Sequence, residues 1–208
     1  MYFPSSKDSA RPKKEDFGEE YFSSGAAYQE YERYVEGWVN KVARKISRLV
    51  ADVPAPSVLD IGCAHGYLIA KLKSRYGMHV YGVEYSTYAY RNRLRAVHSE
   101  VARGDILTAR FPARSFDVVV CFDVFEYLTE AQNKRAAERL VRWSRKYILF
   151  TNPYRHSVNA SQKQNPDPQR ITAFSKKEYR ALFHAVGVVY CGHFDGWHGG
   201  DILIFRKK

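Results

Sequence analysis

Hydrophobic positions along the chain follow two different spacings. From about residue 28 to residue 51 they recur every three or four positions, which predicts an amphipathic helix. Short apolar runs predict seven strands, at 58–61, 79–84, 101–105, 115–122, 147–151, 188–193 and 201–205. Further helices are expected between most of these runs, at 67–76, 87–98, 129–144 and 175–186. Thr129 and Ser175 begin the last two, each followed three positions later by the Gln or Glu of a capping box.

The alternation of strands and helices predicts an open α/β sheet, mostly parallel with an antiparallel last strand and with helices on both faces. Prolines before residue 57 suggest a division into an N-terminal arm and helical cap, residues 1–56, and a main domain, residues 57–208. Residues 1–20 have no periodicity and are expected to form a loose arm. The aromatic cluster that follows is either ordinary packing or a lid over a ligand, with Tyr21, Phe22, Tyr28 and Tyr31 as its members.

The stretch from Ser57 to Gly66 contains the first candidate site. Its strand ends in a tight turn that holds Gly62 and Gly66, where the backbone must bend sharply or let a ligand approach. The dinucleotide fingerprint G-x-G-x-x-G does not fit this spacing. Asp60 precedes the turn, and a carboxylate there suits a ligand with an ammonium or sulfonium group better than a pyrophosphate. An ordinary strand–helix turn is the alternative.

Carboxylates also end the next two strands. Glu84 follows Asp60 by about one βαβ unit and is positioned to accept the two hydroxyls of a ribose. Asp105 ends the third strand and can accept a hydrogen bond from an adenine amino group. Each acid alone could be a turn or cap residue, but three at successive strand ends favour a nucleoside site.

Composition and charge narrow the class of protein. With 45% hydrophobic residues among 208, the chain can form a core and is not globally disordered. It contains no apolar run of transmembrane length and no signal-peptide pattern at its start. Three cysteines without metal-ligand spacing are expected to be buried free thiols in a reducing cytoplasm, namely Cys63, Cys121 and Cys191. The net charge of +11 makes RNA a candidate partner, although the basic residues are spread over several helices.

Five ordered segments between about residues 57 and 205 resemble the class I S-adenosylmethionine (SAM)-dependent methyltransferases, most closely their small-molecule branch called methyltransferase type 11. They are Val58–Gly66, Val80–Glu84, Gly104–Asp105, Ser115–Val120 and Asp123–Leu128. The resemblance implies a Rossmann-like sheet with SAM as the cofactor. The cofactor-binding residues it implies are Asp60, Gly62, Cys63, Gly66, Glu84, Tyr85, Gly104, Asp105, Ile106 and Phe122.

The acceptor side is less defined. Tyr127 stands where the family often has a histidine, and Arg170 ends an Asp-Pro-Gln-Arg segment where many relatives have Asp-Pro-Thr-His. Arg170 is expected to grip a carboxylate or phosphate of the acceptor, or else to pair with Asp167. A base is needed only if the acceptor starts protonated. The candidates are His156, Tyr154, His193, His198 and His65, and the catalytic set expected from the resemblance is His156, Tyr127 and Arg170.

Two further motifs in the sequence resemble known sites but do not match them. The segment from Asn152 to Tyr154 resembles the Asn-Pro-Pro-Tyr signature of amino-group methyltransferases, but it follows the fifth strand and has one proline. Asp123 and Asn152 resemble part of a magnesium site, but Thr151 stands where its third ligand would be, so no metal is expected. The sequence therefore predicts a methyltransferase for a small or medium-sized acceptor, with an anionic one indicated by Arg170. An RNA methyltransferase and a non-catalytic SAM-binding protein are the alternatives.

Overall fold

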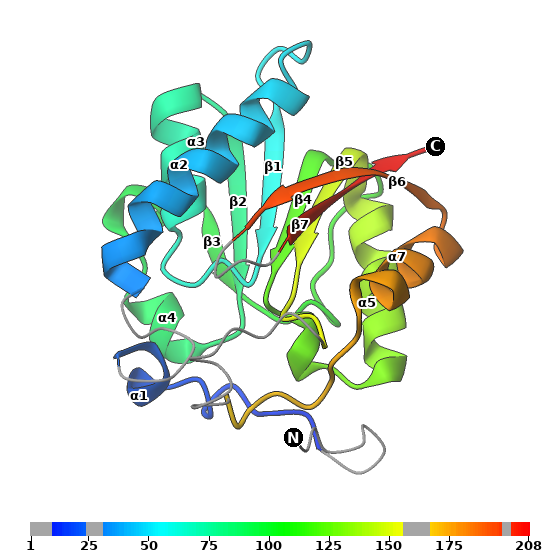
Figure 1. Ribbon diagram of the computed structural model, residues 1–208. Coiled ribbons are helices and arrows are strands. Elements are labelled where there is room, and N and C mark those ends of the chain that lie inside the picture. The colour runs from blue at the N-terminus through cyan, green and yellow to red at the C-terminus, as the bar shows by residue number, and fades with distance from the viewer. Residues whose placement is uncertain (1–9, 24–30, 156–166, 197–200) are drawn as a thin grey trace.

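The computed structural model describes residues 10–23, 31–155, 167–196 and 201–208, and it contains one seven-stranded sheet in the order β3-β2-β1-β4-β5-β7-β6 (Figure 1). The strands are β1 Ser57–Ile61, β2 His79–Glu84, β3 Val101–Arg103, β4 Phe116–Phe122, β5 Ser144–Thr151, β6 Val188–Asp195 and β7 Asp201–Lys207. The pairs among the first five strands are parallel, and β7 is antiparallel to both of its neighbours. This confirms the predicted mostly parallel sheet with an antiparallel last strand.

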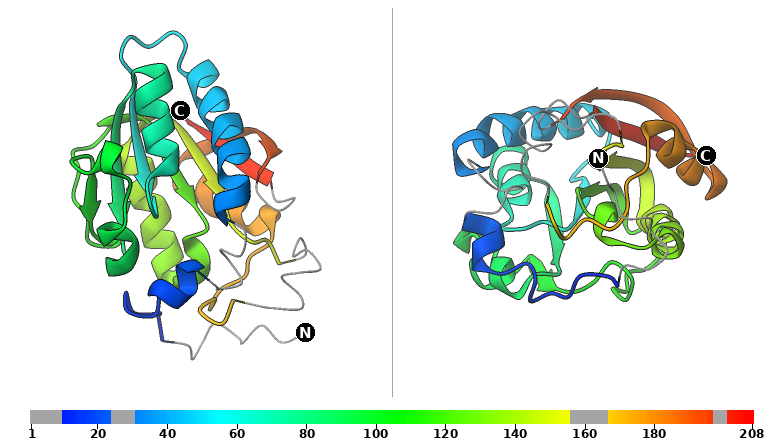
Figure 2. Two further views of the ribbon diagram at one scale, coloured as in Figure 1. Left: turned by 90° about the vertical axis from the view of Figure 1, so that its left-hand side faces the viewer. Right: turned by 60° about the horizontal axis from the view of Figure 1, so that its bottom comes forward.

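Helices cover both faces of the sheet (Figure 2). The helical elements are α1 Glu19–Ser23, α2 Tyr31–Leu49, α3 Tyr67–Tyr76, α4 Thr87–Arg91, η1 Arg95–Val97, η2 Phe125–Tyr127, α5 Glu130–Trp143 and α7 Lys176–Ala185. Both predicted capping boxes are present, at Thr129 and at Ser175. No helix in the described ranges is both long and apolar enough to cross a membrane.

Successive residues of the central strand β4 belong to two different hydrophobic clusters. Val118 and Val120 pack with residues of α2 and α3, whereas Val119 and Cys121 pack with residues of α5 and α7. A strand that is buried on both faces explains the uninterrupted apolar run in the sequence. Because α2 shares its cluster with β1 and β4, it packs onto the sheet, and the proposed boundary at residue 57 stays a prediction.

The helix predicted at 87–98 is wrong in its second half, since α4 ends at Arg91 and a short 3-10 turn follows. The N–H of Leu94 donates to the carbonyl of His65 at 2.9 Å, which draws the chain toward the first turn and out of helical register. The guanidinium of Arg93 donates to the carbonyls of Tyr90 and His98 and replaces the missing helical bonds.

Two other expectations are corrected. The described part of the arm, residues 10–23, is not loose, because Phe17 is buried and the hydroxyl of Ser86 donates to its carbonyl at 2.6 Å. Cys191 lies exposed on β6, at an outward-facing position of the edge strand, whereas Cys63 and Cys121 are buried as expected.

The carboxyl ends of the parallel strands meet at one edge of the sheet, at the bottom of Figure 1. The N-terminal arm and the segment just before α7 both cross this edge (Figure 1). In an open α/β sheet, ligands bind outside the carboxyl ends of the strands. The fold therefore directs attention to the space between the strand ends and these two crossing segments.

Two glycine substitutions test the packing of α3 against β2. A Cβ at Gly82 would lie 2.7 Å from the Sγ of Cys63 and 3.0 Å from Ile69, so Gly82→Ala should destabilise the protein by about 1–3 kcal/mol. Gly37 lies within α2 with nothing within 4 Å of its Cβ position, and Gly37→Ala should stabilise by about 0.5–1 kcal/mol. Urea unfolding measures both, and equal effects of the two changes would contradict this packing.

Candidate active site

A pocket of about 190 Å³ lies at the carboxyl ends of β1, β2 and β4, under the arm and the segment before α7. A single water molecule needs only a small fraction of this volume. Ten of the predicted residues line it, namely Asp60, Gly62, Cys63, Glu84, Tyr85, Gly104, Ile106, Phe122, Tyr127 and Arg170. Gly66 and Asp105 do not line it, and His156 lies outside the described residues.

Glu84 binds the backbone on both sides of the pocket floor. One carboxylate oxygen accepts the N–H of Ala64 at 2.7 Å, and the other accepts the N–H of Ser86 at 2.6 Å. Burial raises the pKa of Glu84 to about 7, although these hydrogen bonds act to lower it. Each carboxylate oxygen accepts more than one hydrogen bond, so Glu84 can still accept ligand hydroxyls.

Asp60 is a buried carboxylate without a hydrogen-bond or ion-pair partner in the described chain. Burial first, and the nearby charge of Glu84 second, raise its pKa to about 7. A buried carboxylate that faces a pocket without a counter-charge is suited to a cationic ligand. The geometry thus agrees with the ammonium-binding role that the resemblance implies.

The two glycines of the first turn have different reasons to be glycine. Gly62 has φ +76°, and a Cβ there would lie 2.4 Å from Val124, so the turn closes only without a side chain. Gly66 has φ +83° and caps α3, and a Cβ there would meet Val97 at 2.8 Å. Gly62 therefore shapes the pocket floor, whereas Gly66 lets the helix pack against the turn at η1.

Arg11 of the arm clamps Asp105. Its guanidinium donates to both carboxylate oxygens, at 2.5 and 3.1 Å, and lies 4.6 Å above the ring of Tyr85. The N–H of Leu107 donates to the same carboxylate at 2.8 Å. Asp105 thus stands beside the pocket, and Arg11 reaches into the pocket in its place.

A chain of phenols links the arm to the segment before α7. The hydroxyl of Tyr127 donates to the carboxylate of Asp167 at 2.7 Å and lies 2.7 Å from the hydroxyl of Tyr21. Burial raises the pKa of Tyr127 well above its ordinary value, and the charges nearby add to this. Tyr127 is therefore a protonated donor near neutral pH, which suits positioning better than proton abstraction.

Arg170 is enclosed by acids. Its Nε lies 3.3 Å from the carboxylate of Glu126 and 3.9 Å from that of Asp167, and its side chain is 11% exposed. Burial alone would lower the pKa of Arg170, but Glu126 and its other neighbours raise it above the ordinary value. Arg170 is thus permanently charged and already paired, which removes the basis for assigning it to an anionic acceptor.

The other predicted bases lie away from the pocket. Tyr154 is buried and donates to the carbonyl of Asp201 at 2.7 Å, and His193 on β6 bonds to the hydroxyl of Tyr190 at 2.6 Å. His65 packs beside Phe22 at the edge of the first turn. His198 lies outside the described residues. The described ranges contain no group of acids, histidines or cysteines that could hold a metal ion.

Several pocket residues were missed by the sequence reasoning or assigned no role by it. They are Arg11, Phe17, Trp38, Ser86, Glu126 and Pro153, with Tyr21 and Phe22 expected only as packing or a lid. Asn152 lines the pocket but is structural, since it accepts the N–H of Phe125 and donates to Tyr179. In the sequence, only the negative charge of Glu126 within the segment Asp123–Leu128 could have indicated that this residue lines the pocket.

Arg170→Gln tests the enclosed ion pair. Without the arginine, Glu126 and Asp167 are buried next to each other without a cation, and the free energy of unfolding at pH 7.5 should fall by about 3–5 kcal/mol. Because burial raises the pKa of Glu126, the loss should shrink as the pH falls and that carboxylate takes up a proton. A double variant with Glu126→Gln should recover part of it. Unchanged stability of the single variant at pH 7.5 would show that the pair contributes nothing.

Comparison with known proteins finds methyltransferases in sequence and in fold. The sequence model of a family described as "Methyltransferase domain" matches residues 58–146. A curated relative from Mycobacterium tuberculosis, named "Probable S-adenosylmethionine-dependent methyltransferase", is 28% identical over 179 residues, covering 80% of this chain and 65% of that protein. The chain thus spans about 65% of the length of that relative.

Solved structures share the fold at low identity. Magnesium protoporphyrin IX methyltransferase from Synechocystis, solved with S-adenosylhomocysteine (SAH) bound, aligns with a TM-score of 0.66 at 17% identity, covering 91% of this chain and 97% of that one. A small RNA methyltransferase aligns with a TM-score of 0.61 at 17% identity, covering 81% of this chain and 25% of that one. The chain thus has the fold of the class I SAM-dependent methyltransferases, and residues 58–146 match the sequence model of a methyltransferase domain.

Proposed function

We propose that the protein transfers the methyl group of SAM to a small or medium-sized acceptor at the carboxyl ends of its strands. The observation that carries this proposal is the unpartnered, buried Asp60 beside Glu84 in a pocket floored by the Gly62 turn. Asp60 would hold the ammonium of SAM, and Glu84 would accept its ribose hydroxyls. Ile106 lines the pocket and would contact the adenine, whereas Asp105 is held by Arg11 beside the pocket.

SAM supplies an activated sulfonium methyl group when bound, so the protein has to align the acceptor and exclude water. The arm contributes to both tasks. Phe17 packs edge-to-face against Tyr21, Tyr85 and Tyr127, which forms an apolar cover over the pocket. On the opposite wall, Trp38 packs against Phe122. Tyr127 would orient the acceptor rather than act as a base.

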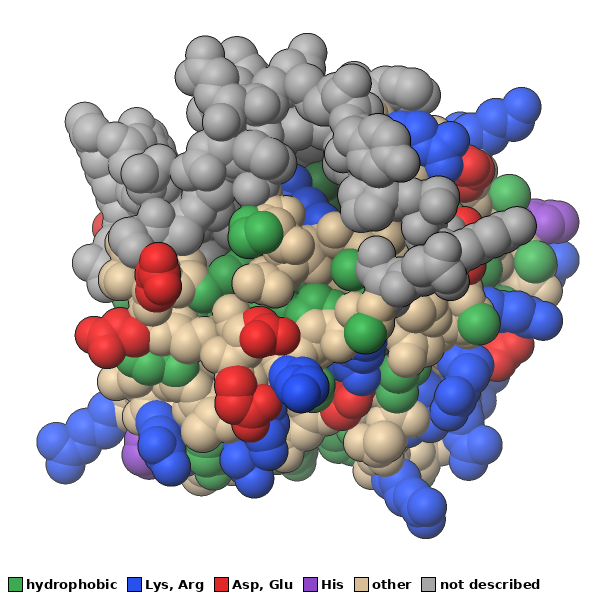
Figure 3. Space-filling model, turned by 90° about the horizontal axis from the view of Figure 1, so that it is seen from below, with side chains coloured by type: hydrophobic (Ala, Val, Ile, Leu, Met, Phe, Trp, Pro, Cys, Tyr) green, Lys and Arg blue, Asp and Glu red, His purple; other side chains and the backbone are tan. Residues whose placement is uncertain are grey.

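The cover favours a compact acceptor over a polynucleotide. Figure 3 looks onto the strand-end face, where acidic and basic side chains are interspersed over the described surface rather than sorted into one basic stripe. RNA stays the second candidate because of the net charge of +11, and its binding would weaken steeply with salt. Binding of SAM without any methylated product from cell extract would favour a non-catalytic protein.

The three free cysteines agree with a reducing, cytoplasmic setting for the protein.

The direct test is calorimetry with SAM and SAH, followed by transfer of radiolabelled methyl from SAM into fractionated extract and mass spectrometry of the labelled species. We expect binding of both ligands and a labelled small molecule. The proposal fails if neither ligand binds, or if the label enters RNA alone.

Glu84→Gln should weaken SAM and SAH binding at least tenfold, since a hydrogen bond to a charged group contributes about 1.5–3 kcal/mol. It should also lower stability, because the amide nitrogen cannot accept the N–H of Ala64 or Ser86. Asp52→Asn is the matched control, since it removes a surface carboxylate paired with Lys146 away from the pocket. Equal affinity in parent and Glu84 variant would assign Glu84 a structural role alone.

SAM affinity should depend on pH through Asp60 and Glu84, whose pKa values burial raises to about 7. A cationic ligand needs the ionised forms, so affinity should rise from pH 5.5 to pH 7.5 and binding should release protons. This window lies below the pKa of an α-amino group, so the ligand itself keeps its charge. Calorimetry in two buffers of different ionisation enthalpy measures the protons. Asp60→Asn should reduce the slope, and a pH-independent affinity in the parent would contradict the assignment.

A further inference from the structure

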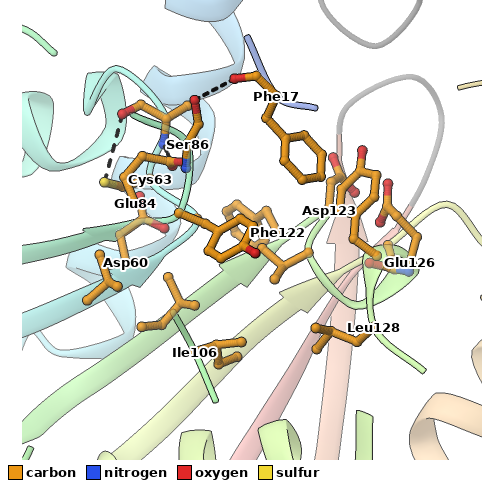
Figure 4. Close-up of a pocket in the computed structure, with 18 of the residues that line it drawn as sticks. Phe17, Asp60, Cys63, Glu84, Ser86, Ile106, Phe122, Asp123, Glu126 and Leu128 are labelled. Carbon is orange, nitrogen blue, oxygen red and sulfur yellow. Dashed lines mark hydrogen bonds between the residues drawn. The ribbon is translucent and has the colours of Figure 1, made fainter. Parts of the chain in front are cut away.

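The pocket carries acidic side chains at two separate ends (Figure 4). Asp60 and Glu84 lie at the end formed by β1 and β2, and Asp123 and Glu126 lie at the other end, with Phe122 between the two pairs (Figure 4). The first pair belongs to the proposed SAM site. The second pair therefore faces the space left for the acceptor.

This acceptor end has more negative than positive charge among the described residues. Asp123, Glu126 and Asp167 are accompanied by Arg170 as the cation within ion-pair distance of two of them. Both oxygens of Glu126 lack a hydrogen-bond partner although the residue is 1% exposed. Asp123 opens onto the pocket with no partner in the described chain. A buried carboxylate normally accepts hydrogen bonds, so Glu126 can still accept a further donor or cation.

The backbone at Asp123 holds its carboxylate in place. The residue has φ +51°, a left-handed conformation that most side chains avoid, and its N–H donates to the carbonyl of Thr151 at 3.0 Å. Asp and Asn tolerate this conformation better than other residues. Backbone strain of this kind persists where the surroundings enforce it, frequently at ligand sites. In Figure 4, Asp123 and Glu126 point the same way, side by side.

We propose that the acceptor presents a positively charged amine, which Asp123 binds directly and Glu126 attracts from behind. This inference rests on the proposed function and names the substrate class of the same site. Arg170 lies within ion-pair distance of Glu126 and Asp167 and is 11% exposed, so its charge is directed at these acids rather than at an acceptor. An anionic acceptor would instead meet two carboxylates before it reached the paired Arg170.

The transfer balances with these groups. The bound ammonium first gives one proton to the Asp123 carboxylate, which leaves a lone pair on the amine nitrogen. That pair forms the new nitrogen–carbon bond to the methyl group as the carbon–sulfur bond breaks, and its electrons stay on sulfur, giving SAH. The product is a methylated ammonium, and Asp123 then returns its proton to solvent.

The electrostatics of the empty pocket agree with this assignment. Although Asp123 is exposed to the pocket, the protein around it raises its pKa to about 6, with Arg170 acting in the opposite direction. Burial likewise raises the pKa of Glu126 well above its ordinary value. A cation bound between the two acids would lower both pKa values again.

The test uses three probes of one size, benzylamine, benzyl alcohol and benzoate, titrated at pH 7.5 into the full-length protein saturated with SAH. NMR shifts or competition report their dissociation constants. We expect benzylamine to bind at least tenfold more tightly than benzyl alcohol, and benzoate more weakly than both. In a variant with Asp123→Asn and Glu126→Gln, the preference should fall below threefold while the SAH dissociation constant stays unchanged. Asn at position 123 preserves the left-handed backbone.

Asp52→Asn, on the far surface, should keep the full preference for benzylamine. Benzoate binding as tightly as benzylamine, the three probes binding equally or not at all, or a preference that survives in the double variant would each overturn the inference. Failure of SAH to bind would instead contradict the proposed function. Labelled product from extract gives a second readout, since a methylated amine moves into organic solvent at pH 11 but not at pH 4. A methyl label released as methanol by alkali would contradict an amine acceptor.

Discussion

One buried carboxylate holds the ligand-binding edge of this fold together. Glu84 accepts backbone N–H groups from Ala64, in the turn after β1, and from Ser86, at the start of α4, so a single side chain joins these two loops. The hydroxyl of Ser86 then binds the carbonyl of Phe17, which attaches the arm to the same point. Glu84 therefore supports three parts of the pocket: the turn that forms its floor, the start of α4, and, through Ser86, the arm that covers it. A group in this position is ready to bind a ligand because the protein has already met most of the cost of burying it.

Local patterns in the sequence were sufficient for the sheet and for most of the cofactor end. Strand, glycine turn and helix follow one another within residues 57–76, and β2 and α3 have the predicted bounds. The remaining parts of the pocket depended on pairings that local patterns do not encode. Arg11 meets Asp105 across 94 residues, and Arg170 meets Glu126 from a segment without periodicity. The sequence left open whether Arg170 binds an anion or pairs with Asp167, and the fold shows it paired with Asp167 and also with Glu126.

The net charge of the whole molecule and the charge of its pocket also differ because of how the chain folds. A net charge of +11 is the sum over a surface on which most charges are solvated and screened within about 8–10 Å. The pocket is shielded from that average, and four acidic side chains line it against two arginines, Arg11 and Arg170. The charge of the chain and the charge of its site thus have opposite signs, and the site, rather than the composition, decides which ligand is accepted.

The position of β7 in the sheet has a consequence for synthesis of the protein. In the described chain, β6 pairs with β7 alone, and β7 fills the place between β6 and β5. Because β7 follows β6 in the chain, the sheet can be completed only once residues 201–207 are present. Until residues 201–207 follow, the edge of β5 is open, and its apolar stretch from Ile148 to Phe150 offers unpaired backbone to other chains. The nascent protein passes through a stage at which aggregation competes with folding, and the insertion of one late strand ends it.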